Sequence, residues 1–138
     1  MRLTIVDRLL DLKSVYHRER FIWGGAQDAG NLHCKILCDG NYTPQRATRY
    51  SYDTHGNVLQ ETFYGNLTGQ GSLPVLDANN LPQDNGTEAY SKRYTYSQDG
   101  KNLLIRKEED SGFIITYDYL PNTDLPTAEL HYDQGTLV

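Results

Sequence analysis

The chain has 138 residues, enough for one domain, and a formal charge of −5 at pH 7. This charge disfavours nucleic acid as a partner, because phosphate binding needs a basic surface. The mean hydropathy of −0.65 and the lack of an apolar run approaching about 20 residues predict no membrane span, and no signal peptide is recognised. Eleven tyrosines, against three phenylalanines and one tryptophan, favour β-structure, since tyrosine suits half-buried pleated surfaces.

The N-terminal segment, residues 1–30, fits two kinds of structure. Apolar residues recur at helical spacing from Ile5 to Tyr16, with basic residues on other faces, which indicates one amphipathic helix. No clear capping box accompanies this pattern, and residues 20–23 have the pattern of extended chain. Strands and a helix therefore both stay open for this segment.

Residues 31–138 are predicted to form a β-sheet region whose first strand spans residues 32–38. This strand contains Cys34 and Cys38, which would lie about 13 Å apart along it. That separation is too long for a disulfide bond, so both cysteines are assigned to the core. Together with His33 they provide too few ligands for zinc, and no metal or cofactor is expected.

A hairpin follows, and then the most informative stretch of the chain. Asp39-Gly40 indicates the hairpin turn, and the returning strand begins near Pro44. Tyr50 and Tyr52 lie two residues apart on this strand and so share one face. Asp53-Thr54-His55-Gly56 has Asp first and Gly last, the preferred chemistry of a type I turn.

Asn57 opens the next strand, which makes a unit of strand, tight turn and strand. Both Gly56 and its counterpart Gly100 are expected at positive φ because they end equivalent turns. Asp53 and His55 could act as an acid and a base. However, Asp53 is the residue type that hydrogen-bonds the backbone of its own turn, no nucleophile is recognised, and no catalytic residue is assigned.

Residues 65–88 differ in kind from the rest, with four glycines, two prolines and four asparagines. We interpret them as a surface loop inserted between two copies of the unit, with a recognition loop as the alternative. Few large apolar side chains are available to anchor this loop, so it is expected to be the most mobile internal segment.

The unit recurs after the loop. Tyr94 and Tyr96 repeat the tyrosine pair, and Ser97-Gln98-Asp99-Gly100 repeats the turn with Ser in place of Asp. Tyr117-Asp118-Tyr119 is a third and looser copy, and residues 127–132 form a final short strand. The sequence thus predicts an all-β antiparallel meander of about six to eight strands in one twisted sheet.

The pattern Tyr-x-Tyr-Asp-x-x-Gly-Asn resembles the core of the YD repeat of RHS proteins. That family includes bacterial polymorphic toxins, the shell subunits of insecticidal toxin complexes and the teneurins. The residues that carry the resemblance are Tyr50, Tyr52, Asp53, Gly56 and Asn57, and in the second copy Tyr94, Tyr96 and Gly100. The second copy departs from the pattern at Ser97, and the third copy lacks the glycine.

The resemblance implies strands in residues 1–30 and a fold in which YD-repeat hairpins build a hollow β-shell. This chain would be a short arc of such a shell, from a truncated or split reading frame, with the remaining shell repeats and an enclosed C-terminal toxin or other passenger as partners. The family is often exported or found at the cell surface. The alternative is a stand-alone β module that binds carbohydrate or protein through its tyrosine-rich face or the 65–88 loop. An enzyme is not expected.

Overall fold

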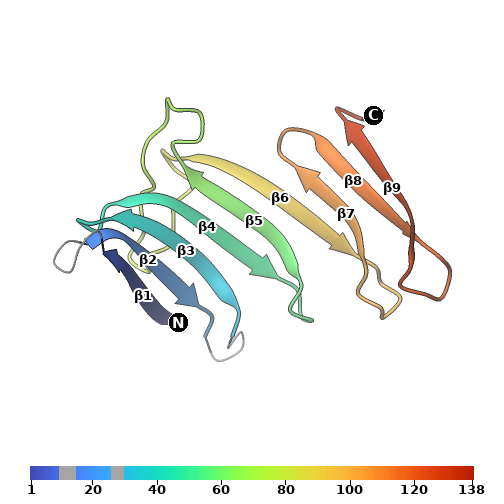
Figure 1. The fold of residues 1–138 in the computed structure, drawn as a ribbon, viewed down its shortest axis with the longest axis horizontal. Coiled ribbons are helices and arrows are strands. Elements are labelled where there is room, and N and C mark those ends of the chain that lie inside the picture. Colours follow the sequence, from blue (N-terminus) through green and yellow to red (C-terminus); the bar gives the residue numbers. More distant parts are fainter. Residues whose placement is uncertain (10–14, 26–29) are drawn as a thin grey trace.

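The computed structural model describes residues 1–9, 15–25 and 30–138, and these residues form a single antiparallel sheet (Figure 1). Each strand pairs with its neighbours along the chain, which confirms the predicted all-β meander. None of the described residues belongs to a helix long and apolar enough to cross a membrane. The strands are β1 (Arg2–Leu9), β2 (Val15–Trp23), β3 (Leu32–Asp39), β4 (Pro44–Tyr52), β5 (Val58–Gly65), β6 (Glu88–Tyr96), β7 (Leu104–Glu109), β8 (Phe113–Tyr119), β9 (Pro126–Asp133) and β10 (Thr136–Leu137).

The described residues form ten strands, which exceeds the prediction of about six to eight. The N-terminal segment contributes β1 and β2, which pair with Leu3 opposite Ile22. The indole N–H of Trp23 also donates a hydrogen bond of 3.2 Å to the Thr4 hydroxyl. The helical alternative is therefore wrong for the described part of this segment, because cross-strand pairs organise its side chains. Leu12, which belonged to the helical pattern, lies outside the described residues.

Alternate side chains project from two opposite faces of the sheet. The first, the core face, carries the buried apolar residues Ile22, Cys34, Ile36, Cys38, Ala47 and Tyr64. The second, the tyrosine face, carries the tyrosine pairs Tyr50, Tyr52, Tyr94, Tyr96, Tyr117 and Tyr119. The two tyrosines of each pair therefore lie on the same face, as their spacing of two residues predicted.

The hydrophobic core lies entirely over β2 to β5. Cys34, Ile36 and Cys38 alternate along β3 and are completely buried, and both cysteines are free thiols. Burial raises the pKa of Cys34 to about 12, although the nearby charge of Arg49 partly opposes this. The prediction that the cysteines are core residues is confirmed.

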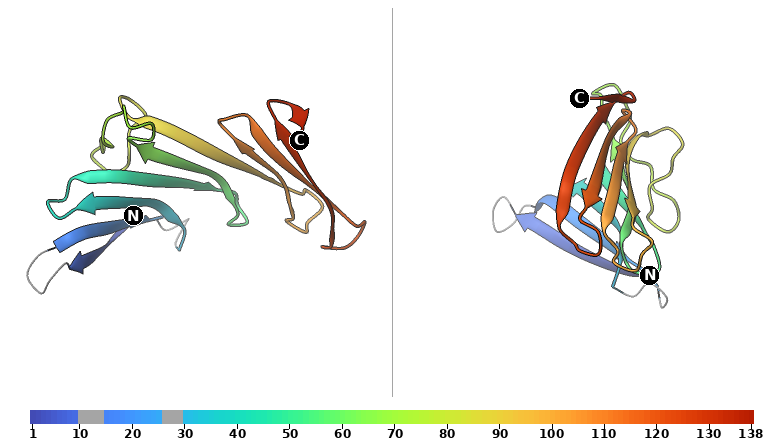
Figure 2. Two further views of the ribbon diagram at one scale, coloured as in Figure 1. Left: turned by 45° about the horizontal axis from the view of Figure 1, so that its top comes forward. Right: turned by 90° about the vertical axis from the view of Figure 1, so that its right-hand side faces the viewer.

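Residues 66–87, between β5 and β6, form a loop that stands on one side of the sheet (Figure 2). Leu76 and Leu81 pack against the core cluster, so the loop covers the core face over β2 to β5. A β-bridge between Leu76 and Pro82 closes a small turn within the loop. Two leucines spaced five residues apart thus anchor this segment to the core, while the expectation that it is the most mobile internal segment stays a prediction.

Candidate functional site

The predicted turn at Asp53 is held together by its own carboxylate. The Asp53 Oδ1 accepts hydrogen bonds from the backbone N–H groups of His55 (2.8 Å) and Asn57 (2.9 Å), and Oδ2 accepts one from the Asn57 side-chain amide (2.8 Å). Gly56 donates its N–H to the Asp53 carbonyl and has a φ of 86°, as expected. The Asn57 amide, followed by the remaining hydrogen bonds, holds the pKa of Asp53 below its ordinary value.

This carboxylate-capped turn recurs at Asp39, where a hairpin turn was predicted, and at Asp77, where no turn was predicted. Asp39 accepts from the N–H groups of Asn41 and Thr43, and Asp77 accepts in the same way from Asn79 and Leu81. The hairpin predicted at Asp39-Gly40 exists, but its turn extends from Asp39 to Thr43. The position equivalent to Gly56 is occupied by two non-glycine residues at positive φ, Tyr42 (67°) and Asn80 (61°). Because neither turn has a glycine at this position, the sequence pattern did not identify them as copies of the Asp53 turn.

The turn after Tyr96 is longer than the repeat predicted. Gly100 has a positive φ of 83°, as expected, but the turn closes from Ser97 to Leu103: the Ser97 N–H donates to the Leu103 carbonyl (2.7 Å), and the Leu103 N–H donates to the Ser97 hydroxyl (3.0 Å). Asn102, at a φ of 57°, supplies a second left-handed residue. Two extra residues therefore separate the strands, and Gly100 does not occupy the position of Gly56.

The second tyrosine of each pair ties one hairpin to the preceding one. The Tyr52 hydroxyl donates to the Leu32 carbonyl (2.7 Å), that of Tyr96 to Val58 (2.9 Å) and that of Tyr119 to Leu104 (2.7 Å). Each acceptor is the first residue of the returning strand in the preceding hairpin. We call these three residues the latch tyrosines.

A register shift accompanies each latch tyrosine. The pairing of β4 with β5 shifts between Ser51 and Tyr52, that of β6 with β7 between Thr95 and Tyr96, and that of β8 with β9 between Asp118 and Tyr119. Such irregularities bend a strand locally and re-aim its side chains. The same donor, acceptor position and irregularity recur three times, so the hairpins are structurally equivalent even where their sequences differ.

Tyr50 and Tyr94, the first tyrosines of two of the pairs, lie on the tyrosine face beside the Glu61 carboxylate. Tyr94 donates its hydroxyl to Glu61 at 3.0 Å, and Tyr50 lies opposite Glu61 in the register of β4 and β5. Burial, and then the negative charge of Glu61, raise the pKa of Tyr50. These rings are half-buried within the sheet, which supports the interpretation that they pack across strands.

Asp53 and His55 lie close in space but are arranged as turn residues. The His55 Nδ1 is 3.9 Å from the Asp53 Oδ2, and the histidine side chain is 67% exposed. The carboxylate is already engaged with the turn, as described above, and the neighbouring imidazole faces solvent. The geometry therefore supports the structural role proposed for Asp53.

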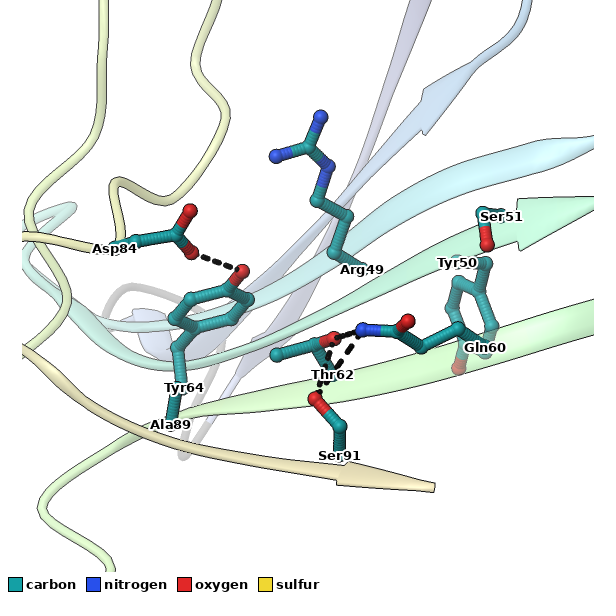
Figure 3. A pocket seen from close by; sticks show the side chains of 9 residues that line it. All are labelled: Arg49, Tyr50, Ser51, Gln60, Thr62, Tyr64, Asp84, Ala89 and Ser91. Atoms are coloured by element: carbon teal, nitrogen blue, oxygen red, sulfur yellow. Dashed lines mark hydrogen bonds between the residues drawn. The ribbon is translucent and has the colours of Figure 1, made fainter. Parts of the chain in front are cut away.

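A hollow lies on the core face beside the loop, at the boundary of the hydrophobic core (Figure 3). It is an open groove of about 440 Å³ built from β4, β5, β6 and the loop. Thr62 and Ser91 form a buried floor, while Arg49 and Asp84 form an exposed rim. The lining consists of Arg49, Tyr50, Ser51, Gln60, Thr62, Tyr64, Asp84, Ala89 and Ser91. None of these except Tyr50 was a predicted site residue.

The polar groups of this groove form two hydrogen-bonded sets. On the floor, the Gln60 side-chain amide donates to the hydroxyls of Thr62 (2.8 Å) and Ser91 (3.2 Å), which are 3.0 Å from each other. On the wall, the Tyr64 hydroxyl donates to the Asp84 carboxylate at 2.7 Å. Burial and this bond raise the pKa of Tyr64 to about 12, against the opposing effect of Arg49.

The sequence offered little sign of the groove, because its residues come from four separate segments and are individually ordinary. The available signal was limited to Gln60 and Thr62 at alternate positions of β5 and Ser91 on β6. The chain matches no protein-family model and no curated protein sequence.

Proposed function

We propose that the chain is a structural segment of RHS/YD-repeat type, an arc in the wall of a larger hollow β-shell that encloses a C-terminal toxin or another passenger. The observation that carries the proposal is the bond of each latch tyrosine to the preceding hairpin. It joins successive units through the same two positions, so units can be added along the sheet with the same contacts each time. Hairpins related in this way suit a wall that grows by repetition.

The edges of the sheet also support a role within a larger assembly. Within the described residues β1 pairs only with β2, and β10 covers only Tyr132 and Asp133 of β9. Leu3 and Ile5 of β1 are 48% and 46% exposed. An uncovered edge with apolar side chains is a template for pairing with further strands. Neighbouring repeats of a shell would supply the strands that pair with this edge.

The test is the association state of the 138-residue chain. We expect self-association and binding of a hydrophobic dye at roughly micromolar concentration, measured by light scattering and fluorescence. An Ile5→Lys substitution should suppress association, because a charge on an edge strand opposes pairing. Leu73→Lys, on an exposed leucine of the loop, is the matched control and should not change it. A monomer with a sharp cooperative melt and no dye binding would contradict the proposal.

The alternative function, a β module that binds carbohydrate or protein, is supported at one place only. The tyrosine face has its rings half-buried and many of its hydroxyls engaged, which leaves little surface for stacking on a ligand. The groove beside the 65–88 loop, in contrast, has an open rim and unsatisfied hydrogen-bonding capacity. A monomeric outcome of the test above would make this module the better proposal.

A further inference from the structure

We infer that the groove on the core face is a binding site for a neutral polyol, such as one unit of a saccharide. The inference rests on the alternative function above and gives its ligand class, and it does not depend on the shell proposal, because it concerns one hollow between the loop and β4 to β6 rather than the bonds between hairpins. It also concerns the face of the sheet opposite to the tyrosine pairs.

The groove originates where one cross-strand row changes from apolar to polar. In this row Ile22, Cys34, Arg49, Thr62 and Ser91 lie opposite one another in turn across β2 to β6. The first two are buried in the core, and the last two are small, polar and buried. Small hydroxyl side chains fill less space than the apolar residues that continue a core, and a hollow remains above them.

The floor of the groove is ordered before any ligand arrives. Because the Gln60 amide nitrogen serves both Thr62 and Ser91, its carbonyl oxygen is turned away from them and is an acceptor toward the groove (Figure 3). One of the two hydroxyls, Thr62 or Ser91, donates its proton to the other. The second hydroxyl keeps its proton and can donate it to a ligand. A ligand therefore meets a fixed acceptor and a donor on the floor.

The rim adds groups of opposite charge. Arg49 rises from β4 on the same side of the sheet as Tyr64 and Asp84, and it presents donors only (Figure 3). Asp84, held by the Tyr64 hydroxyl on one oxygen, keeps its other oxygen as an acceptor. The two charges offset each other. A bound anion would be repelled by Asp84, and a bound cation would be repelled by Arg49.

A ligand for this groove must therefore be neutral and must both donate and accept hydrogen bonds. An apolar ligand would leave the floor and rim groups without partners, which is costly for buried polar groups. Each hydroxyl of a polyol can donate to Asp84 or Gln60 and accept from Arg49 or the floor. The size of the groove, about 440 Å³, falls within the range of small-ligand sites.

The experiment is a titration with glucose, mannose, galactose and N-acetylglucosamine of the isotopically labelled chain carrying Ile5→Lys, which is expected to suppress its association, followed by amide chemical shifts. Weak binding, at about millimolar concentration, is expected for a single sugar unit in an open groove. The expected result is a saturable shift at Thr62, Ala89 and Ser91 with at least one sugar. Glucuronate, as a matched anion, should bind more weakly than the corresponding neutral sugar.

Two variants locate the site. Asp84→Asn and Arg49→Gln should each weaken binding by about tenfold or more, because hydrogen bonds to charged groups are the stronger ones. Both side chains are exposed on the rim, so the fold should survive, as the unchanged shifts of β8 and β9 would verify. Gln83→Ala, one residue from Asp84 and outside the groove, is the control and should leave affinity unchanged.

Three outcomes would overturn the inference. The first is the absence of saturable shifts with every neutral sugar up to about 50 mM, well above the expected range. The second is a set of shifts confined to the tyrosine face. The third is tighter binding of glucuronate that depends on Arg49 alone, or displacement of all sugars by an unstructured peptide, either of which would assign the groove to another class of ligand.

Discussion

The Tyr119 hydroxyl provides the most direct test of the bonds between hairpins. Tyr119→Phe removes the hydrogen bond to the Leu104 carbonyl and leaves that carbonyl without this partner. We expect a loss of about 1 kcal/mol in the free energy of unfolding, the usual contribution of one intramolecular hydrogen bond. Urea titration followed by circular dichroism measures it.

Tyr117 is the matched control, because it lies two residues away on the same strand and face. Its ring lies under Lys107, and its hydroxyl makes no hydrogen bond among the described residues. Tyr117→Phe should therefore change stability by less than about 0.5 kcal/mol. Equal effects of the two substitutions would show that the rings, and not the latch bonds, hold the hairpins together.

The pH dependence of the first turn follows from the lowered pKa of Asp53. A carboxyl whose pKa is lower in the folded chain than its ordinary value of 3.8 stabilises the fold above that value. The contribution is lost as the pH falls through the lowered pKa. Carbon-detected NMR titration should find the pKa of the Asp53 carboxyl below 3.8, and Asn57→Ala should raise this pKa back toward 3.8. A midpoint at or above 3.8 in the native chain would refute the carboxylate-capped turn.

At the scale of elements, the 66–87 loop acts as a cover for the core. Leu76 and Leu81 contact the cluster that contains Cys34 and Cys38. Leu81→Ala should expose part of this cluster, lower the free energy of unfolding by about 1–2 kcal/mol and speed the reaction of the cysteines with a thiol reagent. The buried Cys34, with its pKa of about 12, should be nearly inert in the native chain.

Leu73 is the control for this prediction, since it lies in the same loop and is 43% exposed. Leu73→Ala should leave both the thiol reaction and the stability unchanged. If the two variants label equally fast, the loop does not shield the cysteines, and the original expectation of a loosely held insertion would be restored.

At the scale of the whole molecule, stability should be distributed unevenly along the sheet. Within the described part of the chain, the buried core cluster lies on β2 to β5, whereas no residue of β7, β8 or β9 is buried. Strands with few buried contacts open at lower free energy. Native-state hydrogen exchange should therefore show the strongest protection in β3 to β5 and progressively weaker protection toward β9. Uniform protection along all strands would mean that the sheet unfolds as one cooperative unit.

Local chemistry was enough to predict the strands of the second half and the turn at Asp53. Tyrosine pairs two residues apart specify one face of a strand, and Asp followed by Gly specifies a turn, without reference to the rest of the chain. The predicted turns at Asp39-Gly40 and Ser97–Gly100 were right in place but wrong in length. There, Tyr42 adopts a left-handed conformation that is uncommon for tyrosine, and Asn102 adopts one that asparagine tolerates.

Tertiary structure alone decided how the hairpins are joined and where the groove lies. The bond from Tyr96 to Val58 spans 38 residues, and the groove combines Arg49 with Asp84 from a different segment. Neither has a signature in local sequence, because each depends on the register of several strands and on where the loop packs. The sequence by itself determined the all-β meander and the shared face of the two tyrosines in each pair. The packing of Leu76 and Leu81 onto the core determined that one side of the sheet is covered, and the groove lies beside this cover.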